Sequence, residues 1–373
     1  MSLKHISEEE GIYRFQLSNL NVSLANALRR TILHDIPTYA FEEAKCDIQI
    51  NTGRLHNEIL KHRLSCIPIH MKAITGLSTG SDASEVDETL LKNYVLEVDV
   101  QNDTESTIYV TTADFKIRNK TNGKVLTETE LARIFPKNEK THSPIVFSRL
   151  RPKISDNVPG ERLQLTAEFS IHSAEESSAY SVACTSAYAN TPDRMKADQA
   201  WAEIEQKLKA EKTETEEIEF QKRNFYLLDA QRFYEPNSFD FSVESIGVYD
   251  NHELVKIAAL VLKKQFEDLS QQIEGEDVSI LNSATTMTHS FDFILERGDY
   301  TIGKVLEYYL YSEHFEGDKT LAFCGFKKFH PHDSHSTIRL AFKQTGDKTT
   351  VKQYMKDACK KAAVFYRDLS LRV

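Results

Sequence analysis

The sequence predicts an α+β protein: two related modules in tandem, each a sheet with helices on one side, with a mainly β insert subdomain looped out of the first. Strand patterns that lead up to a polar, turn-rich stretch at residues 155–160 favour a separate subdomain there, and two observations predict the tandem modules. Apolar residues alternate from Tyr13 to Leu17 and, after a polar turn, recur at helical spacing as far as Pro37. A stretch that begins at Phe291 repeats the pattern in the same phase, so strand, turn and helix occur twice.

The first copy begins with a strand in which Tyr13, Phe15 and Leu17 share one face of the pleat. Ser23 is the predicted cap of the helix, which should end before Pro37 because a residue before proline avoids the helical conformation. Apolar residues on one side of this helix form a stripe of Leu24, Ala25, Leu28, Ile32 and Ile36.

Polar residues lie on the other side of the same helix. Asn26 and Arg30 point away from the apolar stripe and Arg29 flanks it, so one face can be buried while the other presents a cation. Taken alone, the pattern favours an amphipathic surface helix with solvated arginines. The second copy is the observation that points to a paired helix instead.

The second copy aligns with the first without a gap after a shift of 278 positions. The matched residues are Tyr13 with Phe291, Phe15 with Phe293, Leu17 with Leu295, Ser23 with Thr301, Leu24 with Ile302, Ala25 with Gly303, Leu28 with Leu306, and Ile32 with Leu310. Two such modules could pair as the two copies in a dimer do. We expect the first module at 1–45 and 160–275, the insert at 46–159, and the second module at 276–373.

Composition and charge disfavour several classes of function. The chain has 373 residues, 40% hydrophobic and 27% charged, with a net charge of −10, and this acidic balance disfavours a protein that grips nucleic-acid phosphates directly. The five cysteines are scattered and form no C-x-x-C pair, which argues against a disulfide framework and a structural zinc site. No segment approaches 18 consecutive apolar residues, so we expect a soluble, intracellular chain without membrane contact.

The stretches between the copies read mainly as strands, with three further features that stand out. Thr75 to Glu88 is rich in Ser, Gly and acidic residues and should be an exposed loop. Residues 193–223 form a highly charged helical stretch, anchored by Trp201. Each module ends in a long amphipathic helix, and the helix that ends the chain should bury Tyr354, Ala358, Ala362, Phe365 and Leu369.

Two clusters could carry chemistry. His330, His332 and His335, with Asp333, have the spacing of a metal site, although Pro331 and the flanking strand patterns favour a connection between strands. On a short helix, Glu58 and His62 lie four residues apart beside Arg63 and could form an acid–base pair, although a structural or interface role is favoured. No phosphate-binding loop, nucleophile elbow or zinc-protease motif occurs in the sequence.

Several motifs in combination resemble a known family. NVSLANALRRTILHDIPTYA (residues 21–40) resembles the first helix of the alpha subunits of multisubunit DNA-directed RNA polymerases. NTGRLHNEILKHRLSCIPI (51–69) and NSFDFSVESIGVY (237–249) are similar to segments of the third subunit of eukaryotic RNA polymerase II and of its archaeal counterpart. DYTIGKVLEYYL and FCGFKKFHPHDSH, in the remainder of the chain, resemble the eleventh eukaryotic subunit and its archaeal counterpart. A fusion of these two partners is similar to the fused subunit of nucleocytoplasmic large DNA viruses.

The resemblance implies an assembly platform with no active site of its own. The partners would be the largest and second-largest polymerase subunits and the small zinc-bearing subunits, with DNA reached only indirectly. Some relatives carry a zinc or iron–sulfur cluster in the insert, but only Cys46 and Cys66 lie near it here, so we expect no cofactor. The location would be virion and host cytoplasm if the chain is viral, and otherwise the nucleus.

The resemblance also implies two sets of contact residues. Module pairing would use Leu24, Leu28, Ile32, Ile36, Ile302, Val305, Leu306 and Leu310. Docking of the large subunits would use Asn26, Arg29, Arg30, Glu58, His62 and Arg63. The alternatives are a DNA-binding transcription factor and a stand-alone metal-dependent enzyme that uses the His330 cluster.

Overall fold

The computed structural model describes residues 1–70, 91–155, 158–275, 277–284, 287–296 and 298–373, and the chain divides into two compact units. Unit 1 consists of Met1–Arg30, Thr185–Glu244 and Leu262–Val373, and unit 2 of Thr31–Cys184 and Ser245–Val261. The loop expected at Thr75 to Glu88 lies outside the described residues. The module and insert limits derived from the sequence stay a prediction.

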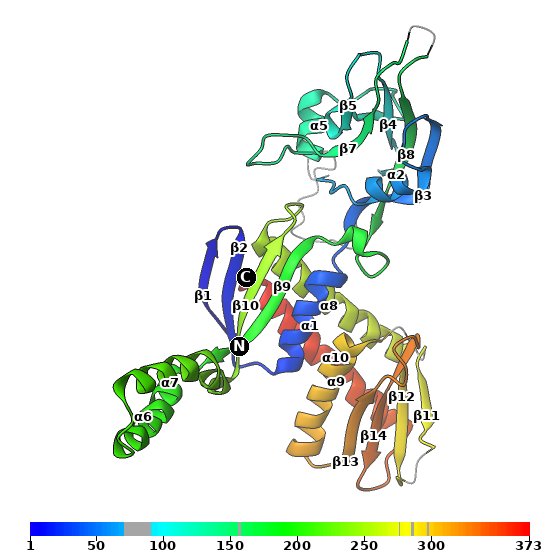
Figure 1. Ribbon diagram of the computed structural model, residues 1–373. Helices are drawn as coiled ribbons and strands as arrows, with labels where there is room; N and C mark the ends of the chain where they lie inside the picture. The colour runs from blue at the N-terminus through cyan, green and yellow to red at the C-terminus, as the bar shows by residue number, and fades with distance from the viewer. Residues whose placement is uncertain (71–90, 156–157, 276, 285–286, 297) are drawn as a thin grey trace. The chain divides into compact units, whose positions relative to one another are not determined.

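The first sheet of unit 1 is antiparallel where its register is given, and it has the strand order β1-β2-β10-β9 (Figure 1). Its strands are β1 (Ser2–Glu9), β2 (Ile12–Ser18), β9 (Ala183–Pro192) and β10 (Tyr234–Ser245). Phe15 on β2 lies opposite Phe241 on β10, with the two rings stacked 5.0 Å apart. Tyr13, Phe15 and Leu17 are all buried, as the alternation predicts.

The second sheet of unit 1 has the order β11-β12-β14-β13. Its strands are β11 (Ser279–Asn282), β12 (Ser290–Glu296), β13 (Leu321–Lys327) and β14 (His335–Phe342). In both sheets the second strand of the set lies between the first and the fourth, and the helix that follows it is α1 (Val22–His34) or α9 (Tyr300–Leu310). Each set is followed by a long helix, α8 (Asn251–Glu274) or α10 (Lys348–Ser370).

The caps of α1 and α9 differ from the prediction. Ser23 and Thr301 lie inside the helices, and the side chains of Asn21 and Asp299 accept hydrogen bonds from the backbone N–H groups of those two residues, at 2.9 and 2.7 Å. An Asx side chain two residues upstream reaches these amides more directly than a hydroxyl at the first turn does. The shift of 278 positions also relates Asn21 to Asp299, so the correction preserves the repeat.

Helix α9 lies close against the second sheet at Gly303. A Cβ atom at this position would come within 2.0 Å of the Phe326 ring on β13, so only glycine allows this approach without movement of the ring. In α10 the fully buried aromatic residue is Tyr366, whereas Tyr354 and Phe365, which were expected to be buried, are only partly so.

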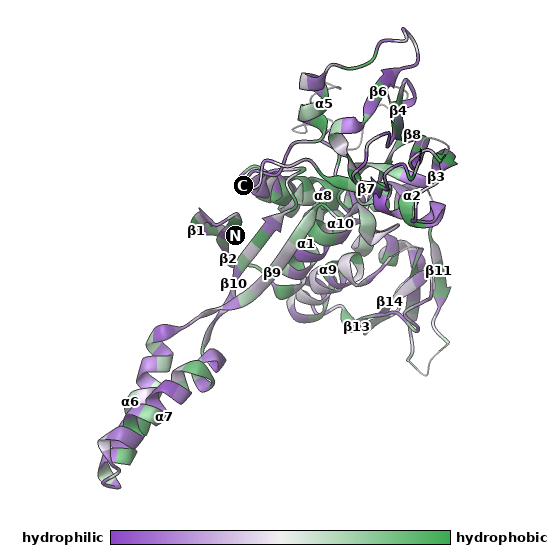
Figure 2. Ribbon diagram, turned by 45° about the horizontal axis from the view of Figure 1, so that its top comes forward, coloured by the Kyte–Doolittle hydropathy of each residue, from purple (hydrophilic) through white to green (hydrophobic). Residues whose placement is uncertain are grey.

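The charged stretch after β9 forms two helices instead of one. They are α6 (Arg194–Ala210) and α7 (Thr215–Leu227), followed by the short turn η3 (Asp229–Arg232). Trp201 is buried between them, with its ring 5.6 Å from that of Phe225, so the anchoring role expected for Trp201 is confirmed. Polar residues cover most of this hairpin (Figure 2).

The base of the α6–α7 hairpin is closed by the backbone, because the N–H of Asp193 donates to the carbonyl of Phe233 at 2.9 Å. We therefore expect replacement of residues 194–232 by a short Gly/Ser linker to leave the unfolding temperature of the remaining chain within about 3 °C of the parent, since loop length affects stability only weakly. Thermal unfolding followed by circular dichroism measures this. A drop of about 10 °C would show that the hairpin supports the first sheet.

Unit 2 contains a four-stranded sheet of order β3-β8-β4-β6 and a two-stranded sheet, β5-β7. The strands are β3 (Thr38–Asn51), β4 (Tyr94–Gln101), β5 (Ile108–Thr111), β6 (Lys116–Asn119), β7 (Val146–Leu150) and β8 (Arg162–His172). The helical segments are α2 (Asn57–Ser65), η1 (Thr112–Asp114), α5 (Glu128–Ile134) and η2 (Ser178–Tyr180).

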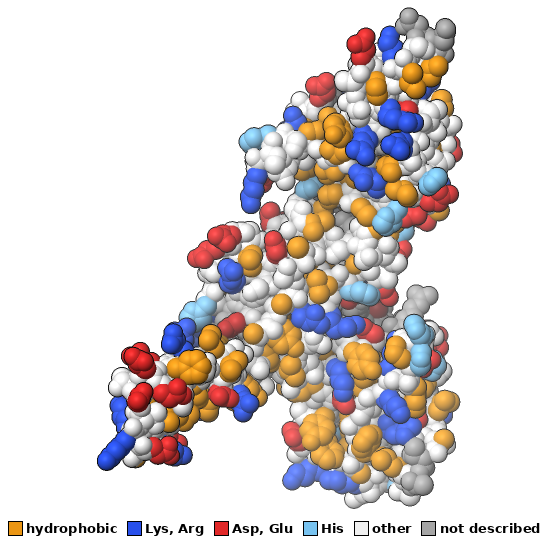
Figure 3. Space-filling view, in the orientation of Figure 1, with side chains coloured by type: hydrophobic (Ala, Val, Ile, Leu, Met, Phe, Trp, Pro, Cys, Tyr) orange, Lys and Arg blue, Asp and Glu red, His pale blue; other side chains and the backbone are white. Residues whose placement is uncertain are grey.

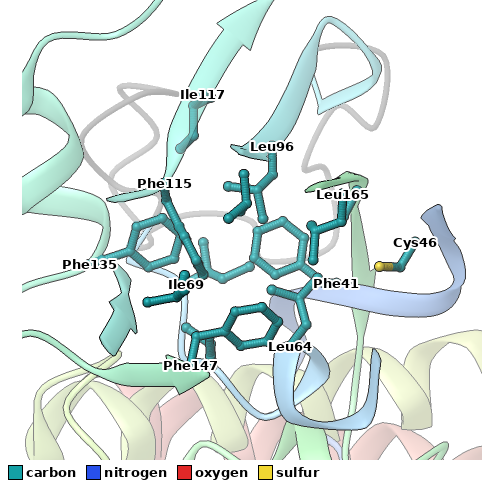
Figure 4. Close-up of a cluster of buried hydrophobic side chains, with 14 of the residues drawn as sticks. Phe41, Cys46, Leu64, Ile69, Leu96, Phe115, Ile117, Phe135, Phe147 and Leu165 are labelled. Atoms are coloured by element: carbon teal, nitrogen blue, oxygen red, sulfur yellow. The ribbon is translucent and has the colours of Figure 1, made fainter. Parts of the chain in front are cut away.

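Aromatic side chains fill the core of unit 2 between these elements (Figure 4). The ring of Phe115 forms edge-to-face contacts with those of Phe135 and Phe147, with the ring centres 5.5 and 5.7 Å apart. Helix α5 begins with the capping box of Thr127 and Glu130, each accepting a hydrogen bond from the other's backbone N–H group. Within the part of the chain that the structure describes, no helix is long and apolar enough to cross a membrane.

Candidate subunit-contact surfaces

The first helices of the two copies are linked inside unit 1. Arg30 on α1 donates from Nε to Thr301 Oγ1 at 2.8 Å and from Nη2 to Asp299 Oδ2 at the start of α9. The guanidinium of Arg30 is thus bound to groups 269 and 271 residues away in the same chain, and the docking of another subunit by Arg30 stays a prediction. Because the planar guanidinium donates to a carboxylate and a hydroxyl at the same time, the two hydrogen bonds fix the orientation of the Arg30 side chain as well as its distance from α9.

The environment of Asp299 favours its charged form. Partial burial acts to raise the pKa of this carboxyl, but the charge of Arg30 and the hydrogen bonds from Thr301 outweigh it and hold the pKa below the ordinary value. The carboxylate therefore caps α9 and pairs with Arg30 at the same time. This places an ionised contact at the junction of the two helices.

Helix α10 supplies a second link. The hydroxyl of Tyr366 is fully buried and donates to the backbone carbonyl of Leu24 on α1 at 3.1 Å. Burial raises the pKa of Tyr366 well above its ordinary value, so this donor keeps its proton. The ring stacks on Phe266 of α8 with the ring centres 6.0 Å apart, and α1, α9 and α10 lie side by side in both ribbon views (Figures 1 and 2).

The residues predicted to pair the modules are mostly buried. Those with almost no exposed surface are Leu24, Leu28, Ile32, Ile36, Val305, Leu306 and Leu310. Ile302 is partly exposed, and Ile36 lies beyond the end of α1. That the two apolar stripes cover each other stays a prediction.

The residues predicted to dock large subunits lie at two separate places in the chain. On α1, Arg29 donates to Asn26 at 3.1 Å, and both side chains are partly exposed. On α2, Glu58 and His62 are exposed, and among the described residues neither side chain forms a hydrogen bond. Arg63 instead donates to the carbonyls of Phe147 and Val146, at 2.7 and 3.0 Å, and so covers one edge of β7.

His330, His332 and Asp333 lie in the turn between β13 and β14, and His335 is the first residue of β14. Asp333 accepts a hydrogen bond from the backbone N–H of His330 at 2.9 Å, and His330 Nδ1 accepts one from the N–H of His332 at 3.1 Å. These oxygen and nitrogen atoms serve the turn instead of converging on one point. Over the described ranges, no three or more His, Cys, Asp or Glu side chains are placed to hold a metal ion.

The buried cysteines are poor nucleophiles. Burial raises the pKa of the Cys46 thiol to about 11 and those of Cys324 and Cys359 to about 12, so all three stay protonated at neutral pH. All five cysteines are free thiols. Thiolate chemistry is therefore not favoured at the three buried positions.

Helices packed beside antiparallel sheets place the chain in the α+β class. The chain belongs to the family described as the RNA polymerase Rpb3/Rpb11 dimerisation domain, whose model matches residues 14–266, more than half of the sequence. The prediction of an alpha-like polymerase subunit is thereby confirmed. The match ends before the second copy, so the fusion and a viral source stay predictions.

Three curated relatives illustrate the similarity. The DNA-directed RNA polymerase subunit Rpo3 of Pyrococcus furiosus is 34% identical over 104 residues, which is 28% of this chain and 36% of the relative. The RNA polymerase II subunit RPB3 of Schizosaccharomyces pombe is 36% identical over 74 residues, 20% of each chain. The RNA polymerases I and III subunit RPAC1 of Homo sapiens is 40% identical over 62 residues, 17% of each. The chain thus matches about a third or less of these relatives' lengths.

Proposed function

We propose that the protein is a non-catalytic assembly platform of a DNA-dependent RNA polymerase, in which the two modules of one chain pair with each other. The hydrogen-bonded contact of Arg30 with Asp299 and Thr301 carries this proposal, because it joins the start of the second copy's helix to the helix of the first. The identical strand order of the two sheets supports it. Fusion would raise the effective concentration of the two modules to the order of millimolar.

The paired modules would dock the largest and second-largest polymerase subunits, and the insert would help to seat the largest subunit or the small zinc-bearing subunits. The relatives named as Rpo3 and RPB3 support a place among the subunits of an RNA polymerase. Contact with DNA would be indirect, in keeping with the net charge of −10. The protein would be found with the assembled enzyme, in virion and host cytoplasm if it is viral and otherwise in the nucleus.

The docking proposal is tested by co-purification of a tagged chain with the two large subunits. We expect Arg29→Glu to reduce their recovery about tenfold or more, because it reverses a partly exposed charge on α1 without removing a contact to the second module. Lys207→Glu makes the same charge change on the α6–α7 hairpin and should leave recovery unchanged. Normal recovery with Arg29→Glu would contradict the proposed docking face.

The pairing proposal is tested on the isolated chain. Light scattering should show a monomer, because the surface that would otherwise form a dimer is used internally. A stable homodimer would exclude pairing within one chain.

A further inference from the structure

A groove of about 670 Å³ opens on unit 2 between β5, β7 and the segment that leads into α2. This volume lies in the range of sites that bind small molecules or short peptide segments. The residues that line it are Arg54, Leu55, Arg63, Thr107, Tyr109, Val146, Ser148, Arg149, Arg151 and Glu161. Four are arginines and one is acidic, in a chain whose net charge is −10.

Two of the arginines are held in place by the fold. Arg63 is fixed by the carbonyls of β7, which leaves other N–H groups of its guanidinium unused by the protein. Arg151 donates from its backbone N–H and from Nε to the two oxygens of Glu161, at 2.7 and 2.5 Å. Glu161 is buried. At the preceding residue, Gly160, the backbone lies so close to the carbonyl of Asn102 that no Cβ atom would fit, so only glycine is suited to this position.

The other two arginines have no acidic partner within the described part of the chain. Among the described residues, no carboxylate pairs with Arg54 or Arg149, and both side chains are exposed. Glu161, the one acidic residue among those described as lining the groove, is already bound to Arg151. The groove therefore holds an excess of positive charge that its own lining does not neutralise.

Apolar surface lies beside these charges. Tyr109 on β5 is directly across from Arg149 on β7, so the two side chains share one face of the two-stranded sheet. Tyr109 is 59% exposed and Val146 is 47% exposed, and both line the groove. Lys and Arg side chains gather beside hydrophobic ones over this part of unit 2 (Figure 3).

We propose that this groove binds a short acidic peptide segment of another protein, with carboxylates on the arginines and an apolar side chain on Tyr109 and Val146. Charge-assisted, often bidentate hydrogen bonds make arginine well suited to carboxylates. A peptide fits better than a nucleic acid because the charge surplus is confined to one groove of an acidic chain and is interrupted by aliphatic surface. This site uses none of the residues of the module contact in unit 1, and it shares only Arg63 with the residues predicted to dock the large subunits.

The test uses the full isolated chain and a fluorescein-labelled synthetic peptide of about nine residues, acidic except for one central phenylalanine, in low salt. We expect saturable binding that Arg149→Glu and Arg54→Glu each weaken about tenfold or more, through loss of a charge-assisted contact and gain of a repulsive one. Tyr109→Ser should weaken it about threefold, and replacing the peptide's phenylalanine by serine should do the same.

Arg133→Glu makes the same charge change on α5, away from the groove, and should leave the affinity unchanged. Circular dichroism establishes that each variant is folded. Three results would overturn the proposal: no saturable binding, equal binding by the arginine variants, or tighter, competing binding of a single-stranded oligonucleotide of equal charge. Because no other polymerase component is present in this assay, its failure leaves the co-purification result unaffected.

Discussion

Replacing Tyr366 by alanine should destabilise the chain by about 3–5 kcal/mol, the range observed when a large buried aromatic side chain is removed. The ring, which belongs to α10, is fully buried against α8, and its hydroxyl donates a hydrogen bond to the backbone carbonyl of Leu24 on α1. The substitution therefore removes packing and a link between the two copies. Urea unfolding followed by circular dichroism measures the loss. Amide hydrogen exchange should also become faster in the first half of α1.

Two variants separate the contributions at this position. Tyr366→Phe keeps the ring and removes only the hydrogen bond to Leu24, so we expect a loss of about 1 kcal/mol. Val364→Ala shortens a side chain on the same helix that is 45% exposed, and should cost less than about 1 kcal/mol. If Tyr366→Ala unfolds at the same urea concentration as Val364→Ala, then Tyr366 does not join α10 to the first copy.

Asp299→Ala should cost about 2–3 kcal/mol, because one carboxylate performs two tasks. About 1 kcal/mol is expected from loss of the cap of α9, and the remainder from leaving Arg30 beside Thr301 without its counter-ion. The pair is about one-third exposed, so solvent screening limits the ionic part. Urea unfolding of the single variants Asp299→Ala and Arg30→Ala and of the double variant yields the coupling between the two residues.

Asp347→Ala is the matched control. Asp347 caps α10 through the N–H and hydroxyl of Thr350, and among the described residues no basic side chain pairs with it, so its loss should cost less than the loss of Asp299. Equal losses for Asp299→Ala and Asp347→Ala would show that the contact with Arg30 contributes nothing.

The contribution of Asp299 should also depend on pH. Because its pKa is held below the ordinary value in the folded chain, the unfolded chain binds the proton more readily, and stability falls as the pH falls through the lowered pKa. The stabilities of the parent and Asp299→Ala should therefore differ at pH 7 and converge below about pH 4. A difference that persists unchanged in acid would contradict an ionised Asp299.

The local structure was largely predictable because it depends on local periodicity. Alternation at Tyr13 to Leu17 predicts β2, and helical spacing predicts α1 and α9. Caps were less predictable, since Asn21 and Ser23 are both good capping residues and only backbone geometry decides between them. In α10, Ala362 lies three residues before Phe365 and four before Tyr366, and both spacings suit a buried face.

Contacts between distant residues could not be read from periodicity. Arg30 pairs with a residue 269 positions away, and the helical wheel shows only that its side chain leaves the apolar stripe, not what it meets. The same holds for Arg54 and Arg149, which lie far apart in the sequence and line one groove only because β7 packs beside the segment leading into α2.

The two cap residues related by the shift of 278 positions are not equivalent in charge. If the modules are equivalent, as proposed, two first modules from different chains would pair so that Arg30 meets the neutral amide of Asn21. Two second modules would pair so that Asp299 meets Tyr308, which occupies the position equivalent to Arg30. Neither like-with-like pairing forms the ion pair. The carboxylate and the guanidinium would thus favour the pairing of a first module with a second module over the pairing of two like modules, and this preference would hold even at a high concentration of the chain.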